Sequence, residues 1–299
     1  MTAEPRLEID DRAEYDRFAT VRGLRVHYLD YPGPLPAIVL LHGLSANANE
    51  FGGLLDEGLA ENHRVIAPDL RGRGRTGKPD SGYSMSHHAA DVIALMDDLG
   101  LDKVVMGGHS FGALLSIYLA ANYPDRISRV IVIDAAIVFH PDTEELLKPS
   151  LARLARILPS ADAYIAEIKG AAHVAGAWDS ALEGYYRAEL QHNPDGTAQS
   201  LTSANAVSQA LRGVAGEDWA ALVAAVRHPV LLLNAGAPYG PPGSPPLVPP
   251  EHAVTTANAF RNCRYVAVPG NHLTMVFGEN AAVVRREIDA FLADDAAGE

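Results

Sequence analysis

Residues 104–120 read VVMGGHSFGALLSIYLA, in which an apolar run leads into a glycine-rich turn and then into a helix-like segment. The turn has the pattern Gly-x-Ser-x-Gly, from Gly108 to Gly112, with Ser110 at its centre. A serine between a strand and a helix must adopt a strained backbone, and small flanking residues let the helix pack closely enough to lift its hydroxyl above the sheet edge. The pattern also arises by chance in a chain with 26 glycines, but the strand before it and the helix after it favour a nucleophile at Ser110.

Short apolar runs alternate with segments of helical length along most of the chain. The runs are continuous, as expected for strands that are covered on both faces, and they predict an α/β fold with a mostly parallel sheet and helices on both faces. Phe18–Val21 and Leu24–Leu29 predict an antiparallel hairpin at the start of the sheet. The predicted central strands are Ile38–Leu41, Val65–Ala67, Val104–Met106, Val130–Ile133, Val230–Leu233 and Tyr265–Val268.

Apolar residues at helical spacing predict helices between these strands. One helix begins behind Ser84 or Ser86 as its N-cap and stops at Gly100. Another follows the serine turn and ends before Pro124, which cannot continue it. The last helix begins near Asn280.

The alternation of strands and helices stops between about Ala136 and His228, where alanine-rich helical stretches run without a convincing β segment. An insertion at this point predicts a helical lid over the carboxyl ends of the strands, where open α/β sheets bind ligands. We therefore expect a core formed by residues 1–135 and 229–299, and a helical cap formed by residues 136–228.

The composition is that of an ordinary globular protein, with 48% hydrophobic and 20% charged residues in a chain of 299. The formal charge of −13 disfavours nucleic acid and anionic membrane surfaces as partners. Met1–Asp16 does not have the pattern of a secretory signal, and no apolar stretch reaches the ~20 residues of a membrane span. Cys263 is the only cysteine, which excludes an intramolecular disulfide. We expect a cytoplasmic protein with a small-molecule substrate, as a monomer or a homodimer.

Four segments resemble, in their order and spacing, the motifs of the α/β-hydrolase superfamily, and the resemblance covers nearly the whole chain. They are Leu41-His42-Gly43-Leu44, Ala67-Pro68-Asp69-Leu70-Arg71-Gly72-Arg73-Gly74, the Ser110 turn, and Gly270-Asn271-His272. The resemblance implies a hydrolase with a nucleophile elbow at Ser110, an oxyanion hole and a catalytic triad.

His272 is the candidate general base. A serine hydroxyl needs a base to remove its proton, and an imidazole with a pKa near 6.5 suits this task. The resemblance implies that the loop after the last strand brings His272 to the elbow. We expect His42 and His109 to be structural, and His87 and His88 to be exposed at a helix start.

The acid of the triad is less directly indicated. The superfamily most often places it after the strand Val230–Leu233, but no aspartate or glutamate occurs from Asn234 to Pro250. Some members carry the acid one strand earlier, where Asp134 stands, and there it orients the histidine and stabilises the imidazolium. The alternatives are that Asp134 only caps the next segment, or that Glu251 is the acid, although Glu251 stands where a helix start favours a carboxylate.

The resemblance implies that the oxyanion hole consists of the backbone N–H groups of Leu44 and Phe111. Ser45 could add a hydroxyl or simply form a local turn. We expect no metal site, since the chain has neither a histidine pair with an acid at ligand spacing nor a cysteine pair. No glycine-rich dinucleotide pattern opens a helix, and we expect no cofactor.

Two further groups of residues have a functional and a structural interpretation. Asp69 and the nearby arginines could bind an anion, but we expect that Asp69 ties its loop and that the arginines pair with acids. Aromatic residues of the cap could line a pocket, although at helical spacing they are usually core. The arginines are Arg71, Arg73 and Arg75, and the cap residues are Tyr164, His173, Trp178, Tyr185 and Tyr186.

These observations predict a cofactor-independent serine esterase or related hydrolase that cleaves a small carboxylic ester, lactone or amide through an acyl-enzyme. A serine at the elbow argues against haloalkane dehalogenase or epoxide hydrolase chemistry, whose family members need aspartate there. Gly77–Tyr83, together with the acid at Asp134, resembles hydrolases of ring-cleavage products and enamide acids. The alternatives are a C–C bond hydrolase of ring-cleavage products, a perhydrolase or haloperoxidase-type activity, and a non-catalytic ligand-binding protein.

Overall fold

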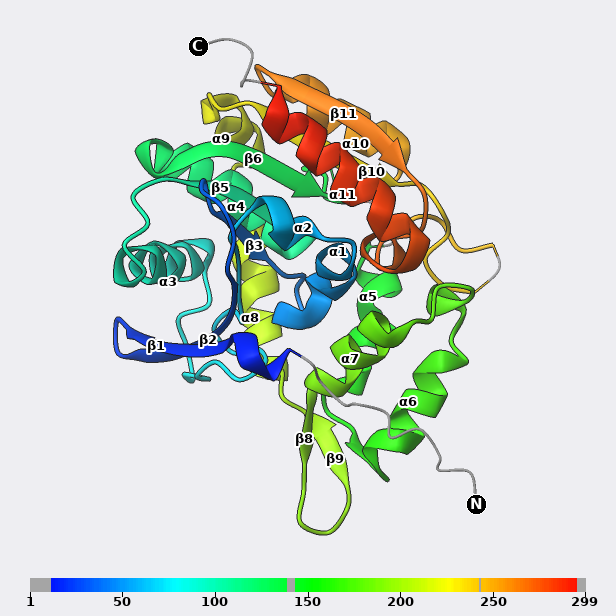
Figure 1. The fold of residues 1–299 in the computed structure, drawn as a ribbon. Helices are drawn as coiled ribbons and strands as arrows, with labels where there is room; N and C mark the ends of the chain where they lie inside the picture. Colours follow the sequence, from blue (N-terminus) through cyan, green and yellow to red (C-terminus); the bar gives the residue numbers. More distant parts are fainter. Residues whose placement is uncertain (1–11, 139–142, 242, 295–299) are drawn as a thin grey trace.

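The computed structural model describes residues 12–138, 143–241 and 243–294, so part of the amino-terminal segment considered above, residues 1–11, lies outside the described residues. Eight strands form one sheet in the order β1-β2-β4-β3-β5-β6-β10-β11 (Figure 1). The strands are β1 (Asp16–Val21), β2 (Leu24–Tyr31), β3 (Ile38–Leu41), β4 (Val65–Pro68), β5 (Val104–His109), β6 (Ile127–Ile133), β10 (Val230–Ala235) and β11 (Cys263–Val268).

The sheet is mostly parallel, as predicted. The pairs β4–β3, β3–β5, β5–β6, β6–β10 and β10–β11 are parallel, whereas β2 pairs antiparallel with β1 and β4. All six predicted central strands and the hairpin are present. His109 is opposite Ile133 in the register of β5 and β6, so the chain leaves these two neighbouring strands side by side, at Ser110 and Asp134.

Alternate residues of the strands pack into two apolar layers. Val39 and Leu41 belong to the layer that contains helices α3, α4, α9 and α10, whereas Ile38 and Leu40 belong to the layer of α1, α2 and α11 (Figure 1). Both faces of the sheet are therefore covered, which explains the continuous apolar runs. The helices are α1 (Gly52–Asp56), α2 (Leu59–Asn62), α3 (Met85–Asp98), α4 (Phe111–Asn122), α9 (Trp219–Ala225), α10 (Pro250–Ala259) and α11 (Gly278–Ala293).

The helix ends follow the local signals of the sequence. Ser84 is the N-cap of α3, and its hydroxyl accepts a hydrogen bond from the backbone N–H of His87. Tyr123 ends α4 directly before Pro124. The described residues also form five short 3-10 helices: η1 (Ala13–Tyr15), η2 (Ala48–Phe51), η3 (Pro124–Arg126), η4 (Ala172–Val174) and η5 (Thr274–Val276).

The long connection between β6 and β10 contains both helices and short strands. Its elements before α9 are α5 (Thr143–Arg153), β7 (Ile157–Leu158), α6 (Ala161–Lys169), α7 (Ser180–Ala188), β8 (Leu190–His192), β9 (Ala198–Ser200) and α8 (Ala204–Ala215). The expectation that this region lacks β structure is wrong, because β7, β9 and β8 form a small antiparallel sheet. Strands of two or three residues are too short to produce a period in the sequence.

The helices between β6 and β10 pack in two different parts of the molecule. Figure 1 shows α5, α6 and α7 grouped beside the ends of the parallel strands. In contrast, Trp219 and Val223 of α9 belong to the same apolar layer as α4. The division into a core and a cap of residues 136–228 stays a prediction, and positions 139–142 lie outside the described residues. None of the helices in the described ranges is long and apolar enough to span a membrane.

Candidate active site

Ser110 occupies a strained turn between β5 and α4, with φ 54° and ψ −114°. Its backbone N–H donates to the carbonyl of Ile133 over 2.9 Å. A Cβ atom on Gly108 would lie 2.3 Å from the backbone of Gly112, and one on Gly112 would lie 1.8 Å from the carbonyl oxygen of Leu41. Both glycines are therefore required for the close approach of strand and helix that presents the serine.

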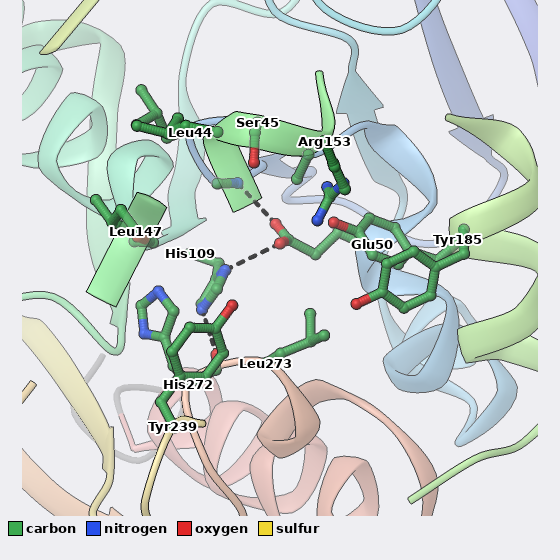
Figure 2. A pocket seen from close by; sticks show the side chains of 15 residues that line it. Leu44, Ser45, Glu50, His109, Leu147, Arg153, Tyr185, Tyr239, His272 and Leu273 are labelled. Carbon is green, nitrogen blue, oxygen red and sulfur yellow. Dashed lines mark hydrogen bonds and ion pairs between the residues drawn. The ribbon is translucent and has the colours of Figure 1, made fainter. Parts of the chain in front are cut away.

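A cavity of about 60 Å³ lies above the carboxyl ends of the strands (Figure 2). Its lining contains Ser110, His272 and Leu44, three of the residues that the sequence singled out. By volume the cavity holds on the order of four water molecules, which favours a small ligand. Further lining residues come from the predicted cap, residues 136–228: Leu147, Leu151, Arg153, Tyr185 and Tyr186.

His272 and Asp134 are in direct contact. The Nδ1 atom of His272 lies 2.6 Å from Oδ2 of Asp134, and the carboxylate is completely buried. The other oxygen of Asp134 accepts hydrogen bonds from the side chain of Asn234 (2.8 Å) and the backbone N–H of Ala235 (2.9 Å). A carboxylate held in this way makes Nδ1 of His272 the donor, and the lone pair of a neutral ring is then on Nε2.

No hydrogen bond joins the Ser110 hydroxyl to the His272 ring among the residues that the structure describes. Both side chains line the same cavity, and catalytic hydrogen bonds often tighten only when a substrate is bound. Asp134 also has a positive φ of 49°, so two of the three candidate residues have strained backbones. Such strain persists only where the surrounding structure over-determines the conformation.

The pKa of His272 lies below its ordinary value. Burial is the main cause, because it disfavours the charged ring, and the positive charge of His109 is the second. The contact with Asp134 acts in the opposite direction. The ring is consequently neutral, and available as a base, at pH values where a free histidine is partly protonated.

The two candidate oxyanion donors come from different segments of the chain. Phe111 is the first residue of α4, where backbone N–H groups have no partner within the helix. Leu44 lies in the cavity wall, and its carbonyl accepts a hydrogen bond of 3.0 Å from Arg73. Its loop is also held by His42, which accepts from the backbone N–H of Leu70 over 2.9 Å, in the structural role that we predicted.

Glu50 is a site residue that the sequence analysis did not single out. It is 2% exposed, and its Oε2 atom accepts from the backbone N–H of Gly43 over 2.7 Å. Its Oε1 atom lies 3.1 Å from Nδ1 of His109, whose Nε2 atom lies 2.6 Å from the backbone oxygen of His272. The only signal in the sequence is an acid beside Phe51 in a segment of small and polar residues, and nothing there links it to His109.

Asp69 ties its loop as expected. Its carboxylate accepts from the ring of His27 (2.7 Å) and from the backbone N–H groups of Ala48 and Arg75 (both 2.8 Å). The expected pairing of arginines with acids holds for two of the three arginines, since Arg71 pairs with Asp91 over 2.6 Å and Arg75 pairs with Asp16.

Arg73 is the exception. It is fully buried, donates to the carbonyls of Leu44 and Arg71, and lies 2.9 Å from Nε2 of His88. Burial lowers its pKa to about 9, and no carboxylate pairs with it in the described part of the chain. The expectation of an exposed His88 is also wrong, because its ring is 1% exposed on the inner face of α3.

Arg153, at the end of α5, is the second site residue that the sequence analysis missed. Its Nη2 atom donates to Glu189 over 2.9 Å, and Glu189 also accepts from the hydroxyl of Tyr164. Its Nε atom is buried without a hydrogen-bond partner. Figure 2 shows the guanidinium end of Arg153 directed toward the cavity. Of the five cap residues considered, Tyr185 and Tyr186 line the cavity, whereas its described lining does not include the other three.

The remaining candidates lie elsewhere. Glu251, the alternative acid, is exposed in the first turn of α10. Cys263 begins β11, and burial raises the pKa of its thiol to about 12, which makes it a poor nucleophile. The described residues contain no cluster of three or more side chains that could hold a metal ion.

Comparison with known proteins gives consistent matches. A family model described as alpha/beta hydrolase fold matches residues 36–279. The 2-(acetamidomethylene)succinate hydrolase of Mesorhizobium japonicum is 31% identical over 209 residues, which cover 68% of this chain and 71% of that enzyme. A soluble epoxide hydrolase of Corynebacterium sp. is 38% identical over 116 residues, which cover 39% of this chain and only 40% of that enzyme. The crystal structure of an E-2-(acetamidomethylene)succinate hydrolase superposes with a TM-score of 0.79 at 24% identity, covering 93% of this chain and 98% of that one, which shows a shared fold.

Proposed function

The chain belongs to the alpha/beta hydrolase fold family, and we propose that within it the protein is a serine hydrolase that cleaves a small carbonyl substrate through an acyl-enzyme. The observation that carries this proposal is the 2.6 Å contact between Asp134 and His272, whose side chain lines the same cavity as Ser110.

In the proposed reaction, the Ser110 hydroxyl attacks the substrate carbonyl while Nε2 of His272 takes its proton. The backbone N–H groups of Leu44 and Phe111 stabilise the oxyanion, and each such donor typically contributes about 10²–10³-fold in rate. His272 then transfers the proton to the leaving group. In the second half, it deprotonates a water molecule that releases the acyl group and restores Ser110. Asp134 keeps the ring in the required tautomer throughout.

Serine at the elbow favours this chemistry over that of the epoxide hydrolase relative, because an alkyl-enzyme intermediate requires a carboxylate nucleophile. C–C bond hydrolysis and perhydrolysis use the same three side chains. Assays with a ring-cleavage diketone, and with peroxide in place of water, distinguish them from ester, lactone or amide hydrolysis.

We further propose that the substrate carries a carboxylate, which Arg153 binds. A buried guanidinium nitrogen without an acceptor costs about 1–3 kcal/mol, and a substrate oxygen at this position would remove that cost. The small cavity and the name of the Mesorhizobium japonicum relative, which describes a succinate derivative, support a small carboxylic acid.

The role of Ser110 is tested by labelling the folded protein with a fluorophosphonate probe and locating the adduct by mass spectrometry. We expect one adduct on Ser110, and near-complete loss of hydrolysis in Ser110→Ala, on a panel of activated esters, lactones and amides. A folded protein that neither labels nor turns over any of them would instead be a ligand-binding protein.

The role of Arg153 is tested with two esters, uncharged p-nitrophenyl acetate and mono-p-nitrophenyl succinate, whose longer acyl group carries a carboxylate. We expect Arg153→Met to raise KM for the succinate ester about 10- to 100-fold, because a hydrogen bond to a charged group is lost, and to change the acetate ester little. The double variant Arg153→Met/Glu189→Gln removes the unpaired carboxylate that the single change leaves. Lys169→Met, at an exposed cap cation outside the cavity lining, is the control. Equal effects on both esters would contradict a carboxylate site.

A further inference from the structure

A second histidine–carboxylate pair lies beside the proposed base. Glu50 and His109 are each 2% exposed, and the rings of His109 and His272 are 4.5 Å apart between centroids. Neither side chain has a role in the proposed reaction, although both line the cavity (Figure 2). A buried ion pair is weak evidence for stability, so its presence at this place requires another explanation.

The hydrogen-bond partners of His109 determine its charge. Its Nε2 atom faces the backbone oxygen of His272, which can only accept, so this nitrogen carries a proton. Its Nδ1 atom faces Glu50, whose other oxygen already accepts from the backbone N–H of Gly43. A proton shared between an imidazole and a carboxylic acid goes to the more basic imidazole. Both nitrogens of His109 are therefore donors, and the ring is an imidazolium.

We propose that Glu50 and His109 form a positioning pair that holds the His272 loop in place and keeps the His272 ring neutral, and therefore competent as a base, in mildly acidic solution. The inference rests on the proposed role of His272. Glu50 and His109 act through His272 and through the backbone, and neither is a catalytic residue.

The pair connects the three loops that form the site. Gly43 precedes the oxyanion residue Leu44, His109 directly precedes Ser110, and the carbonyl that His109 holds belongs to His272 itself. A continuous set of hydrogen bonds thus runs from the loop after β3, through η2 and the elbow, to the loop after β11. Without any one of these hydrogen bonds, the nucleophile, the base and the oxyanion hole would no longer be held in fixed positions relative to one another.

The charges around the two rings agree with this arrangement. Burial alone would lower the pKa of His109, but the Glu50 carboxylate raises it above its ordinary value, and Asp134 acts in the same direction. Burial opposes ionisation of Glu50, yet His109 lowers its pKa. His42 also faces Glu50 from the β3 loop, but burial lowers the pKa of His42 and keeps it neutral.

His272 itself faces Asp134, His109, the more distant Glu50 and the ring of Tyr239, which lies 5.5 Å away between centroids. Asp134 favours the protonated form of His272, and the adjacent His109 cation opposes it. The same carboxylate that orients the base would otherwise make it easier to protonate. The positive charge of His109 therefore allows Asp134 to orient the His272 ring without making that ring easier to protonate.

Glu50→Gln separates charge from geometry. The glutamine oxygen can accept from Gly43 N–H, and its amide can donate to Nδ1 of a neutral His109, whose Nε2–H still donates to His272. We expect the acid side of the pH profile of kcat/KM to shift to higher pH by about one unit, so that kcat/KM on that side falls about tenfold. The plateau value at higher pH should change less than about threefold. The control is Glu57→Gln, at an exposed acid seven residues further along.

A second measurement does not depend on activity. In the ¹⁵N NMR spectrum of labelled protein, we expect the His109 ring to stay doubly protonated while His272 titrates, and to become neutral in Glu50→Gln. A neutral His109 ring in the wild-type protein, or an acid limb that does not move in folded Glu50→Gln, overturns the inference. The wild-type spectrum decides even if the variant fails to fold. Full activity in Ser110→Ala would instead contradict the proposed function and leave the protonation of His109 unchanged.

Discussion

The two sides of the cavity differ in how completely their buried charged side chains are paired. On the core side, Glu50 lies in the cavity wall and Asp134 lies behind it in contact with His272, and the oxygens of both buried carboxylates all accept hydrogen bonds. On the cap wall, Arg153 also has a carboxylate partner, but one of its buried nitrogens has none. Carboxylates with all their oxygens paired can hold their partners rigidly, whereas an open donor leaves a place for a ligand to fill.

The difference extends to the backbone. Ser110 on the core wall and Asp134 behind it both have positive φ angles, and neighbouring strands hold them through backbone hydrogen bonds of 2.9 and 2.8 Å to Ile133 and Leu233. The cap residues that line the cavity come from α5 and α7. In the proposed function, the core wall would determine the chemistry and the cap wall would determine which substrate reaches it.

The largest effect is expected on the core side, in Asp134→Asn. The new side chain would accept from Asn234 and Ala235 with its oxygen and present its NH₂ group to Nδ1 of His272. This forces the proton onto Nε2, the wrong tautomer, and we expect kcat to fall by about 10³–10⁴-fold. Steady-state kinetics with an activated ester measures the loss.

Glu251→Gln serves as the matched control, because Glu251 is the exposed alternative acid. We expect it to leave kcat unchanged. Near wild-type turnover in Asp134→Asn would place the acid elsewhere and remove the basis for treating the core wall as the reacting one.

A smaller effect is expected in the cap, at His173 outside the cavity lining, as the pH falls. The pKa of His173 is lowered to about 4, mainly by burial and also by the charge of Arg153. As the pH falls, His173 of the unfolded chain, with a pKa near 6.5, binds a proton before His173 of the folded chain does. The free energy of unfolding is therefore highest above pH 6.5 and decreases as the pH falls toward 4. We expect a loss of about 2 kcal/mol in this window.

The backbone oxygen of His173 accepts a hydrogen bond from the side chain of Asn271 over 2.8 Å. Because Asn271 directly precedes His272, local unfolding around His173 would also destabilise the His272 loop. Denaturant unfolding of wild type and His173→Gln, at pH 7 and pH 4.5, tests this expectation. The same pH dependence in both proteins would assign the acid sensitivity to another group.

The smallest effect is expected when one helix N-cap is removed in the core and one in the predicted cap. The Ser84 hydroxyl caps α3 in the core, and the Ser160 hydroxyl caps α6 by accepting from Ala163 N–H over 3.1 Å. Replacing either serine by alanine should cost about 1 kcal/mol. We expect Ser84→Ala to lower Tm, and Ser160→Ala to increase hydrogen exchange in α6 without an equal change in Tm. Equal changes in Tm would mean that the two regions unfold together.

The sequence by itself determined which segments form the central strands, where the serine turn lies, and that Asp134 and His272 each follow a strand. These features depend on local signals, because apolar runs, helix caps and the small residues of the turn are read within a few positions. The contact between Asp134 and His272 followed from the resemblance together with an absence of acids in one loop, and its catalytic role stays a proposal.

Only the tertiary structure showed which side chains pair with one another around the cavity. Glu50 and His109 are 59 residues apart, His109 and His272 are 163 apart, and Arg153 and Glu189 are 36 apart. It also decided that Arg73 and His88 are buried together and that three short strands join the cap. The physical reason is that a charge state depends on which partners meet a side chain in space, and neither composition nor periodicity contains that information.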